Sequence, residues 1–286
     1  MLKLSTQTLH PAKKFGIKKA VEMIIDAGFE AIDLSLFDLL NPTSEFYGED
    51  FFAKAKEIRA IAESRGVCFN QAHAPFPSYK EGNEEYNKAV LPAIEKAIEI
   101  AAAVGAEQIV VHPTFLEENK KEFNMQFYNG FEPLCRKLGI KIALENMFRS
   151  DPLNPPKKYP NVCSIPKEFR DYVDSLDPDC FTACLDIGHC GLVGVDLEEM
   201  IETLGGKLTA LHIHDNDGIH DMHTMPFTQK IDFAVVARAL KKIGYKGDLT
   251  LEADEFMARM PKELYPDALR LMRAADAHLR QMIEEA

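Results

Sequence analysis

Residues 137–146 read KLGIKIALEN, and this stretch contains the unit that predicts the fold. Gly139 is typical of a helix end, and the apolar residues after it predict a short strand over 141–146. The same order of helix, glycine and strand recurs at DAGFEAIDL (26–34), SRGVCF (64–69), AVGAEQIVV (103–111) and KIGYKGDLTL (242–251). Repetition of this unit indicates a parallel sheet with helices packed on it.

Eight segments have apolar patterns of strand length: residues 2–6, 31–35, 67–73, 108–112, 141–146, 181–186, 208–214 and 248–253. Between them, apolar residues recur at helical spacing. Two of these expected buried faces are Leu91, Ile94, Ile98 and Ala101, and, in the last helix, Leu264, Ala268, Met272, Ala275 and Leu279. The alternation predicts an α/β fold, a (β/α)8 TIM barrel in which residues 1–286 form a single domain. An open doubly wound sheet is the alternative, but the chain contains neither a GxGxxG turn nor a P-loop.

The composition is ordinary for a globular protein, with 46% hydrophobic and 27% charged residues. A net charge of −12 argues against a nucleic-acid-binding surface, because contacts to phosphates need Lys and Arg. The six cysteines include no CxxC pair, and the start of the chain lacks the apolar run of a secretion signal. We therefore expect free thiols and a cytoplasmic protein. No apolar stretch is long enough to cross a bilayer, so no membrane partner is expected.

A proline-rich segment, FRSDPLNPPKKYPNVCSIP (148–166), follows the fifth strand. Its length predicts a loop over the mouth of the barrel, and the alternative is a surface excursion without a functional role. Lys157, Lys158 and Lys230 lie in loops near this mouth and are candidates for contacts to a substrate phosphate. Solvated surface lysines would give the same pattern.

Residue types that bind metals stand at the ends of six consecutive predicted strands, and in such a barrel the active site is at these C-terminal ends. The residues are His73, His112, Glu145, Asp186, His212 with His214, and Glu252. A single histidine at a strand end is more often a hydrogen-bonded core residue. The prediction of a site therefore depends on the whole set.

Strand alternation predicts that these side chains point into the barrel. In ALHIHD (210–215), Leu211 and Ile213 share one face, and His212 and His214 share the other. The apolar face should pack on the helices, so imidazoles and carboxylates converge in a partly desolvated cavity. Their burial would be costly without a divalent cation, and these ligands suit zinc, manganese or cobalt.

The stretch LHIHDNDGIHDMHTM (211–225) holds four of the nine histidines of the chain. Within it, residues 215–217 belong to the site or form a polar turn, and the sequence leaves both open. Cys184 and Cys190, which flank Asp186, are expected to be small buried fillers instead of ligands.

Taken in order, these motifs resemble those of the xylose isomerase-like TIM barrels. That superfamily comprises sugar and sugar-phosphate isomerases and epimerases, together with the endonuclease IV type of DNA-repair enzyme. The matching pieces are HAPF (73–76), VVHP (110–113), ALEN (143–146), CLDIGH (184–189), LHIHDND (211–217), DMH (221–223) and TLEAD (250–254). They extend from the third predicted strand to the eighth.

The resemblance implies a metal site formed by Glu145, Asp186, His212 and Glu252. Glu145 and Glu252 would also be the catalytic pair, one removing a proton next to a carbonyl group and the other returning it. The additional ligands of the endonuclease branch match His73, His112, His189, Asp221 and His223. These five residues could bind a second or third metal, or they could contact the substrate, and the sequence leaves both alternatives open.

The chain departs from the family pattern at two places. Phe227 and Gln229 stand where glycines are expected after DMH, which changes the wall of the cavity. Residues 217–219 contain no arginine where the epimerases often carry one. The second departure weakens an assignment to the ketose 3-epimerases and leaves isomerase, dehydratase and other lyase chemistry open.

The leading interpretation is a metal-dependent isomerase or epimerase in carbohydrate metabolism, acting on a small sugar, sugar phosphate or related polyol. One alternative is an endonuclease IV-like zinc phosphodiesterase that acts on abasic DNA, although the net charge disfavours it. Another is a barrel that binds a metabolite without catalysis. A homo-oligomer is open, because such assemblies are common in the family that the chain resembles.

Overall fold

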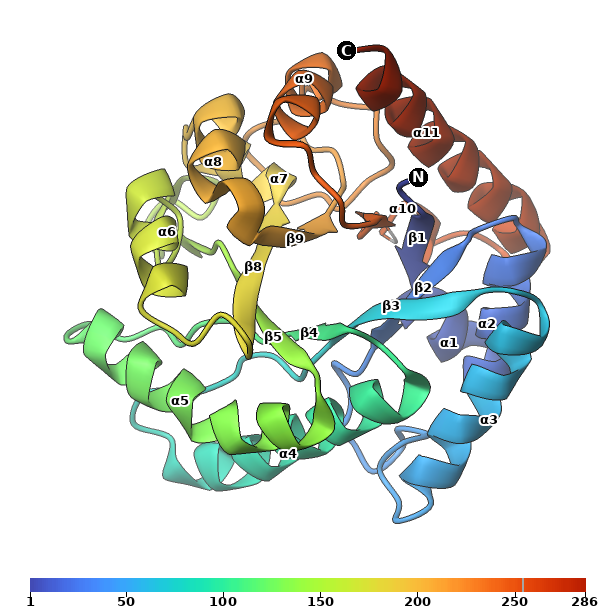
Figure 1. Ribbon diagram of the computed structural model, residues 1–286, viewed down its shortest axis with the longest axis horizontal. Coiled ribbons are helices and arrows are strands. Elements are labelled where there is room, and N and C mark those ends of the chain that lie inside the picture. Colours follow the sequence, from blue (N-terminus) through green and yellow to red (C-terminus); the bar gives the residue numbers. More distant parts are fainter. Residues whose placement is uncertain (254) are drawn as a thin grey trace.

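In the computed structural model, which describes residues 1–253 and 255–286, parallel strands form the wall of a barrel (Figure 1). Asp254, the last residue of the TLEAD motif, lies outside the described residues. Neighbouring strands follow the order β10-β1-β2-β3-β4-β5-β8-β9. Their bounds are β1 (Leu4–Gln7), β2 (Ala31–Ser35), β3 (Cys68–His73), β4 (Gln108–Val110), β5 (Lys141–Glu145), β8 (Phe181–Asp186), β9 (Leu208–His212) and β10 (Leu249–Leu251).

The barrel closes between its last two strands. Ile213 forms an isolated parallel bridge with Leu251. Its amide donates to the carbonyl oxygen of Thr250 (2.9 Å), and the amide of Glu252 donates to the carbonyl oxygen of Ile213 (3.0 Å). The predicted TIM barrel is thereby confirmed, and the chain forms one domain.

Helices surround the strands in an outer ring (Figure 1). They are α1 (Leu9–Phe15), α2 (Ile17–Asp26), α3 (Phe51–Ser64), α4 (Glu84–Val104), α5 (Lys120–Leu138), α6 (Pro166–Asp174), α7 (Ile187–Leu192), α8 (Leu197–Leu204), α9 (Phe233–Ile243), α10 (Glu255–Ala258) and α11 (Tyr265–Glu285), with 3-10 turns η1 (Gly205–Lys207) and η2 (Lys262–Leu264). None of the described helices is long and apolar enough to cross a membrane.

The two faces of each strand have different partners, as the alternation predicts. On β5, Ile142 and Leu144 belong to the large hydrophobic core between strands and helices. Ala143 points the other way and joins a small cluster inside the barrel with Val110, Cys184 and Ala210. The side chain of Glu145, on the same face as Ala143, therefore emerges above this cluster at the C-terminal end of the strand.

All eight predicted strands are present, but several end earlier than expected. His112 lies two residues beyond β4, His214 lies two residues beyond β9, and Glu252 directly follows β10. Two helix faces are also corrected. Leu91 and Leu264 are exposed, because the buried face of α4 runs through Val90 and Ile94 and because α11 begins only at Tyr265. On α11, Asp276 is fully buried in place of its neighbour Ala275.

The proline-rich segment contains a hairpin that the sequence did not predict. Strands β6 (Phe148–Ser150) and β7 (Lys158–Pro160) pair antiparallel, with Phe148 opposite Pro160 and Ser150 opposite Lys158. Because β6 begins three residues after Glu145, the hairpin projects from the C-terminal end of β5.

Candidate active site

A cavity of about 450 Å³ lies at the C-terminal end of the barrel. Metal-ligand residue types and aromatic rings line different parts of it. The polar lining consists of the metal-ligand types His112, Glu145, His189, Asp221, His223 and Glu252, together with Arg149 and Ser150. The apolar lining consists of Phe37, Phe76, Phe115, Met147 and Phe148.

The four residues of the expected single-metal site lie together. Glu145, Asp186, His212 and Glu252 each place one ligand atom within 4.8 Å of the ligand atoms of the other three. His212 Nδ1 is 3.3 Å from Glu145 Oε2 and 3.3 Å from Glu252 Oε2. Neither His212 Nδ1 nor Glu145 Oε2 has a hydrogen-bond partner among the described residues, although both are buried. Such orphaned donor atoms fit a divalent cation.

His73, at the end of β3, and His112, two residues beyond β4, approach the same glutamate. His112 Nε2 is 3.2 Å and His73 Nε2 is 3.7 Å from Glu145 Oε2. These three residues form a second group with ligand atoms within 4.8 Å of one another. Glu145 thus belongs to both groups and is placed to bridge them.

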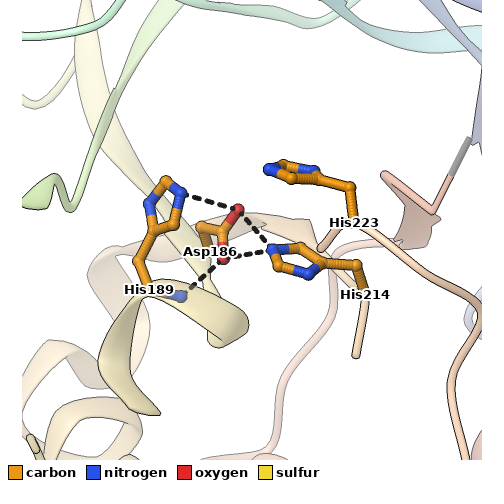
Figure 2. Close-up of side chains that lie close together, drawn as sticks. All are labelled: Asp186, His189, His214 and His223. Atoms are coloured by element: carbon orange, nitrogen blue, oxygen red, sulfur yellow. Dashed lines mark hydrogen bonds and ion pairs between the residues drawn. The ribbon is translucent and has the colours of Figure 1, made fainter. Parts of the chain in front are cut away.

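A third group surrounds Asp186 (Figure 2). The imidazoles of His189 and His214 point at its carboxylate from two sides, with His214 Nε2 3.0 Å from Oδ1 and His189 Nε2 3.6 Å from Oδ2. The ring of His223 stacks on that of His214, with centroids 4.0 Å apart. Asp221 adds a carboxylate 3.1 Å from His223 Nε2 and 3.8 Å from His189 Nε2.

The buried acids and imidazoles shift one another's pKa values. Burial favours the neutral form of Glu145, but His212 and His112 hold its pKa well below the usual value. Burial also opposes ionisation of Asp186, yet His189 and His214 lower its pKa to about 2. Burial lowers the pKa of His189, but the carboxylates of Asp186 and Asp221 raise it, and the pKa reaches about 10. Glu145 and Asp186 are therefore ionised at neutral pH, and a cation would have to displace a proton from His189.

Asn146 fixes the positions of Asp186 and His189 through hydrogen bonds. Its Oδ1 accepts from the amide of Asp186 (2.8 Å), and its Nδ2 donates to the carbonyl oxygen of the same residue (2.9 Å). The Asn146 carbonyl oxygen accepts from His189 Nδ1 (2.7 Å), which leaves Nε2 facing the carboxylates. Backbone and amide contacts of this kind fix the orientation of a metal ligand. From the sequence, Asn146 is recognisable only as the last residue of the ALEN motif.

Asp33 is a further buried acid at the site, and it is not among the residues predicted from the sequence. It lies on β2, accepts from Gln71 Nε2 (3.0 Å), and places Oδ2 4.0 Å from His212 Nε2. Alternation could have found it, because Ile32 and Leu34 occupy the other face of that strand. Burial raises the pKa of Asp33, while His212 and His73 act in the opposite direction.

The polar turn at residues 215–217 organises the loop that carries Asp221 and His223. Asp215 is fully buried. Its Oδ1 accepts from the amides of Asn216 (2.9 Å) and Ile231 (3.0 Å), and its Oδ2 accepts from Thr228 (3.0 Å) and Gln229 (2.7 Å). Asp217 forms an outer turn in which it pairs with His220 (2.8 Å). Residues 215–217 therefore hold the loop that carries Asp221 and His223 in place, but they do not themselves belong to the ligand groups of the site.

Three phenyl rings of the apolar lining pack on histidines of the site. The ring centroids of Phe37 and His73 are 4.0 Å apart, those of Phe76 and His112 are 4.4 Å apart, and those of Phe148 and His189 are 4.9 Å apart. These contacts restrain the imidazole planes and keep water from one side of each ring. All nine site residues expected from the sequence thus lie in one connected cluster beneath an aromatic wall.

The chain belongs to the family of xylose isomerase-like TIM barrels, whose sequence profile matches residues 21–275. An uncharacterized protein of Methanocaldococcus jannaschii is 30% identical over 226 residues, which are 74% of each chain. An uncharacterized protein of Sinorhizobium fredii is 25% identical over 261 residues, covering 83% of this chain and 81% of that one.

Solved structures share the fold at lower identity. A D-tagatose 3-epimerase-like protein superposes with a TM-score of 0.77 at 21% identity and covers 99% of both chains. The 3-keto-D-glucoside 4-epimerase of E. coli gives 0.72 at 19%, covering 96% of this chain and all of that one. The IOLI protein with a bound zinc atom gives 0.73 at 18% and covers 99% of both chains.

Proposed function

We propose that the protein is a metal-dependent isomerase or epimerase of a small sugar, sugar phosphate or related polyol. One observation carries the proposal. Glu145 and Glu252 both line the cavity and both lie 3.3 Å from His212 Nδ1, yet they come from β5 and β10, which are not neighbours in the barrel. Two carboxylates can therefore face a bound substrate from different sides.

The cation would be held by Glu145, Asp186, His212 and Glu252, a set of imidazole and carboxylate ligands that suits zinc, manganese or cobalt. When bound, it would supply polarisation of the substrate carbonyl group next to the reacting carbon. The groups around His73 and His112 and around His189, His214 and Asp221 leave room for further cations.

The proton is moved by the two glutamates. His212 and His112 keep Glu145 ionised, so it can remove the proton from the carbon next to the carbonyl group. Glu252, entering the step as the carboxylic acid, donates a proton from the other side, which gives epimerisation at the same carbon. Isomerisation results when the proton goes to the neighbouring carbon and the hydroxyl proton there passes to the former carbonyl oxygen. Exchange with solvent then removes the proton gained by Glu145 and restores the one lost by Glu252. The proposal is supported by the epimerases among the proteins of the same fold.

Exchange of a carbon-bound proton tests this chemistry directly. We expect the protein to introduce deuterium from heavy water into at least one member of a panel of ketoses and ketose phosphates, measured by NMR. Glu145→Gln and Glu252→Gln should each slow the exchange by roughly a hundredfold or more while the protein stays folded. The matched control is Glu107→Gln, an exposed glutamate next to the start of β4 at the opposite end of the barrel. Full activity of either active-site variant would refute the two-carboxylate mechanism.

Metal content tests the ligand assignment independently of activity. Protein purified without added metal should contain at least one transition metal per chain by elemental analysis. His212→Ala should reduce that content, whereas His220→Ala should not, because His220 is an exposed partner of Asp217. Equal metal content in the two variants would contradict the assignment.

An endonuclease IV-like zinc phosphodiesterase acting on abasic DNA is the second candidate. The observation in its favour is that several overlapping ligand groups lie in one cluster, since hydrolysis of a phosphodiester commonly uses more than one cation. Cleavage of an abasic duplex in the same zinc-loaded preparation, without deuterium exchange into any ketose, would establish this function and exclude the first.

A further inference from the structure

We propose that hairpin β6–β7 binds an anionic group of the substrate, a carboxylate or a phosphate, through Arg149 and Ser150. This inference rests on the proposed function in one respect, namely that the substrate occupies the cavity above Glu145 and Glu252. It adds a substrate class: a small carbonyl compound with an anionic group distant from the reacting carbon.

The hairpin is built to present these two residues to the cavity. Phe148, Arg149 and Ser150 form strand β6 and all line the cavity. Pairing with β7 sets Lys158 opposite Ser150, and Lys158 Nζ donates to Ser150 Oγ (2.8 Å). The lysine thereby directs a positive charge toward the hydroxyl that an anion would contact.

The guanidinium of Arg149 is available for a ligand. It forms no salt bridge with any residue that the structure describes, and its recorded contact is with the ring of Tyr159, 5.8 Å from the centroid. Arg59, Arg136 and Arg170 each pair with a carboxylate. Arg238 has no salt bridge with a described residue either, but it does not line the cavity, whereas Arg149 does. Arg149 lines the cavity and has no carboxylate partner among the described residues. Its guanidinium can therefore form a charge-assisted, bidentate pair with an anionic group that the substrate brings.

The aromatic side of the cavity restricts which substrates can bind. Phe37, Phe76, Phe115 and Phe148 offer rings and no hydrogen-bonding groups. A substrate hydroxyl that faced this wall would lose its bonds to water without replacement, which costs free energy. The part of the substrate between the metal-ligand residues and Arg149 therefore presents carbon to the wall, as one face of a ring does.

Binding of matched pairs of small molecules tests the proposal. The pairs are glucuronate with glucose, and fructose 6-phosphate with fructose, measured by isothermal titration calorimetry on the purified full-length protein. We expect at least one charged member to bind roughly tenfold tighter or more than its neutral partner, as one charge-assisted pair allows. Which pair shows the difference separates a carboxylate from a phosphate.

The Arg149→Met variant should remove most of that preference, and Arg149→Lys should retain part of it. Arg238→Met is the matched control, because Arg238 is also exposed but lies on α9, away from the residues that line the cavity. Unaltered preference in R149M would show that the anion binds elsewhere, including to a cation of the site, and would overturn the proposal. Equal binding of charged and neutral members by the wild-type protein would overturn it too.

The outcome is separable from that of the proposed function. Deuterium exchange into a neutral ketose without any preference for anions would leave the isomerase proposal intact and refute the role of the hairpin. A preference for anions that depends on Arg149, without deuterium exchange into any ketose, would support the role of the hairpin and refute the isomerase proposal. The thermal midpoint of R149M should equal that of the wild type, because Arg149 supports no described ion pair.

Discussion

The imidazole of His214 lies directly against the backbone of Gly188. A Cβ atom at that position would be 2.1 Å from His214 Cε1, 2.4 Å from Nε2 and 2.8 Å from Asn216 Nδ2. Gly188 is needed for space, since its backbone is that of the helix α7 in which it stands. The contact between His214 and Asp186 therefore depends on the absence of a side chain two residues after Asp186.

We expect Gly188→Ala to displace the ring of His214 and to lower the free energy of unfolding by about 1–3 kcal/mol, the usual cost of overpacking. Zinc should also raise the thermal midpoint less in this variant than in the wild type. Gly191→Ala in the same helix is the control, because its Cβ would be 4.0 Å from the nearest atom, an ordinary contact. A wild-type response to zinc in G188A would show that His214 does not matter for cation binding.

Phe227, which stands where the family pattern has a glycine, has an unusual backbone conformation. It has a φ of 70°, in the left-handed region that glycine favours. A glycine, which the family pattern has at this position, would adopt this backbone conformation without strain. The ring of Phe227 packs against Phe233 and His278, whose ring centroids are 4.6 Å and 5.2 Å away.

At the scale of elements, Asp215 connects β9 to the loop that returns toward α9. Its two oxygens accept four backbone amides, so the loop forms around one buried carboxylate. The same loop carries Asp221 and His223 to the cavity.

Asp215→Asn should lower the free energy of unfolding by about 3 kcal/mol or more, because the amide nitrogen would face two N–H donors and hydrogen bonds to a charged group contribute roughly 1.5–3 kcal/mol each. Urea denaturation measures the change. Asp217→Asn is the control, since Asp217 forms its turn at the surface, and its loss of stability should be much smaller than that of Asp215→Asn. Similar losses in both variants would contradict the organising role of Asp215.

The elements also show what the sequence can and cannot predict. The eight strands follow from their apolar alternation, because residues such as Ile142 and Leu144 can only be buried under helices. The antiparallel pairing of β6 and β7 is not predictable in this way, because FRS and KYP have no apolar alternation and their pairing is set by contacts within the hairpin. Likewise, the contact of His214 with Asp186 depends on the close approach of Gly188 in space, which no local pattern reveals.

At the scale of the whole molecule, α11 brings the end of the chain against its first strand. The helix packs against β1 and β10, and on that face Asp276 is fully buried. Neither oxygen of Asp276 has a hydrogen-bond partner of standard geometry among the described residues. Burial raises its pKa well above the usual value, against the opposing effects of the Ser5 amide, Arg280 and Arg273, and Glu30 adds to the rise.

This acid should make the stability of the barrel depend on pH. Because its pKa is higher in the folded state, the folded chain holds a proton that the unfolded chain loses above a pH of about 4. The contribution of Asp276 is thus complete at lower pH and decreases by about 1.4 kcal/mol per pH unit until the pH passes the folded pKa. Asp276→Asn should remove this slope in urea titrations between pH 4 and pH 8.

The control is Asp267→Asn on the same helix, where the exposed carboxylate pairs with Arg270. That variant should keep the wild-type slope. If Asp276→Asn also kept it, the buried acid would have to be ionised in the folded protein, with its charge compensated by Arg280 or Arg273.

The closure of the barrel has a consequence for its local opening. Strands β9 and β10 share one bridge, whereas β1, for example, pairs with β10 and with β2 over three residue pairs each. His212 and Glu252 lie on the two sides of this junction, so a cation bound by both would be a crosslink between the last two strands. The amides of Ile213 and Glu252, which form the junction, should then exchange with deuterium faster after chelation, while the amides of β2 and β3 keep their protection. Hydrogen exchange at two backbone positions would in this way report occupancy of the site without any substrate.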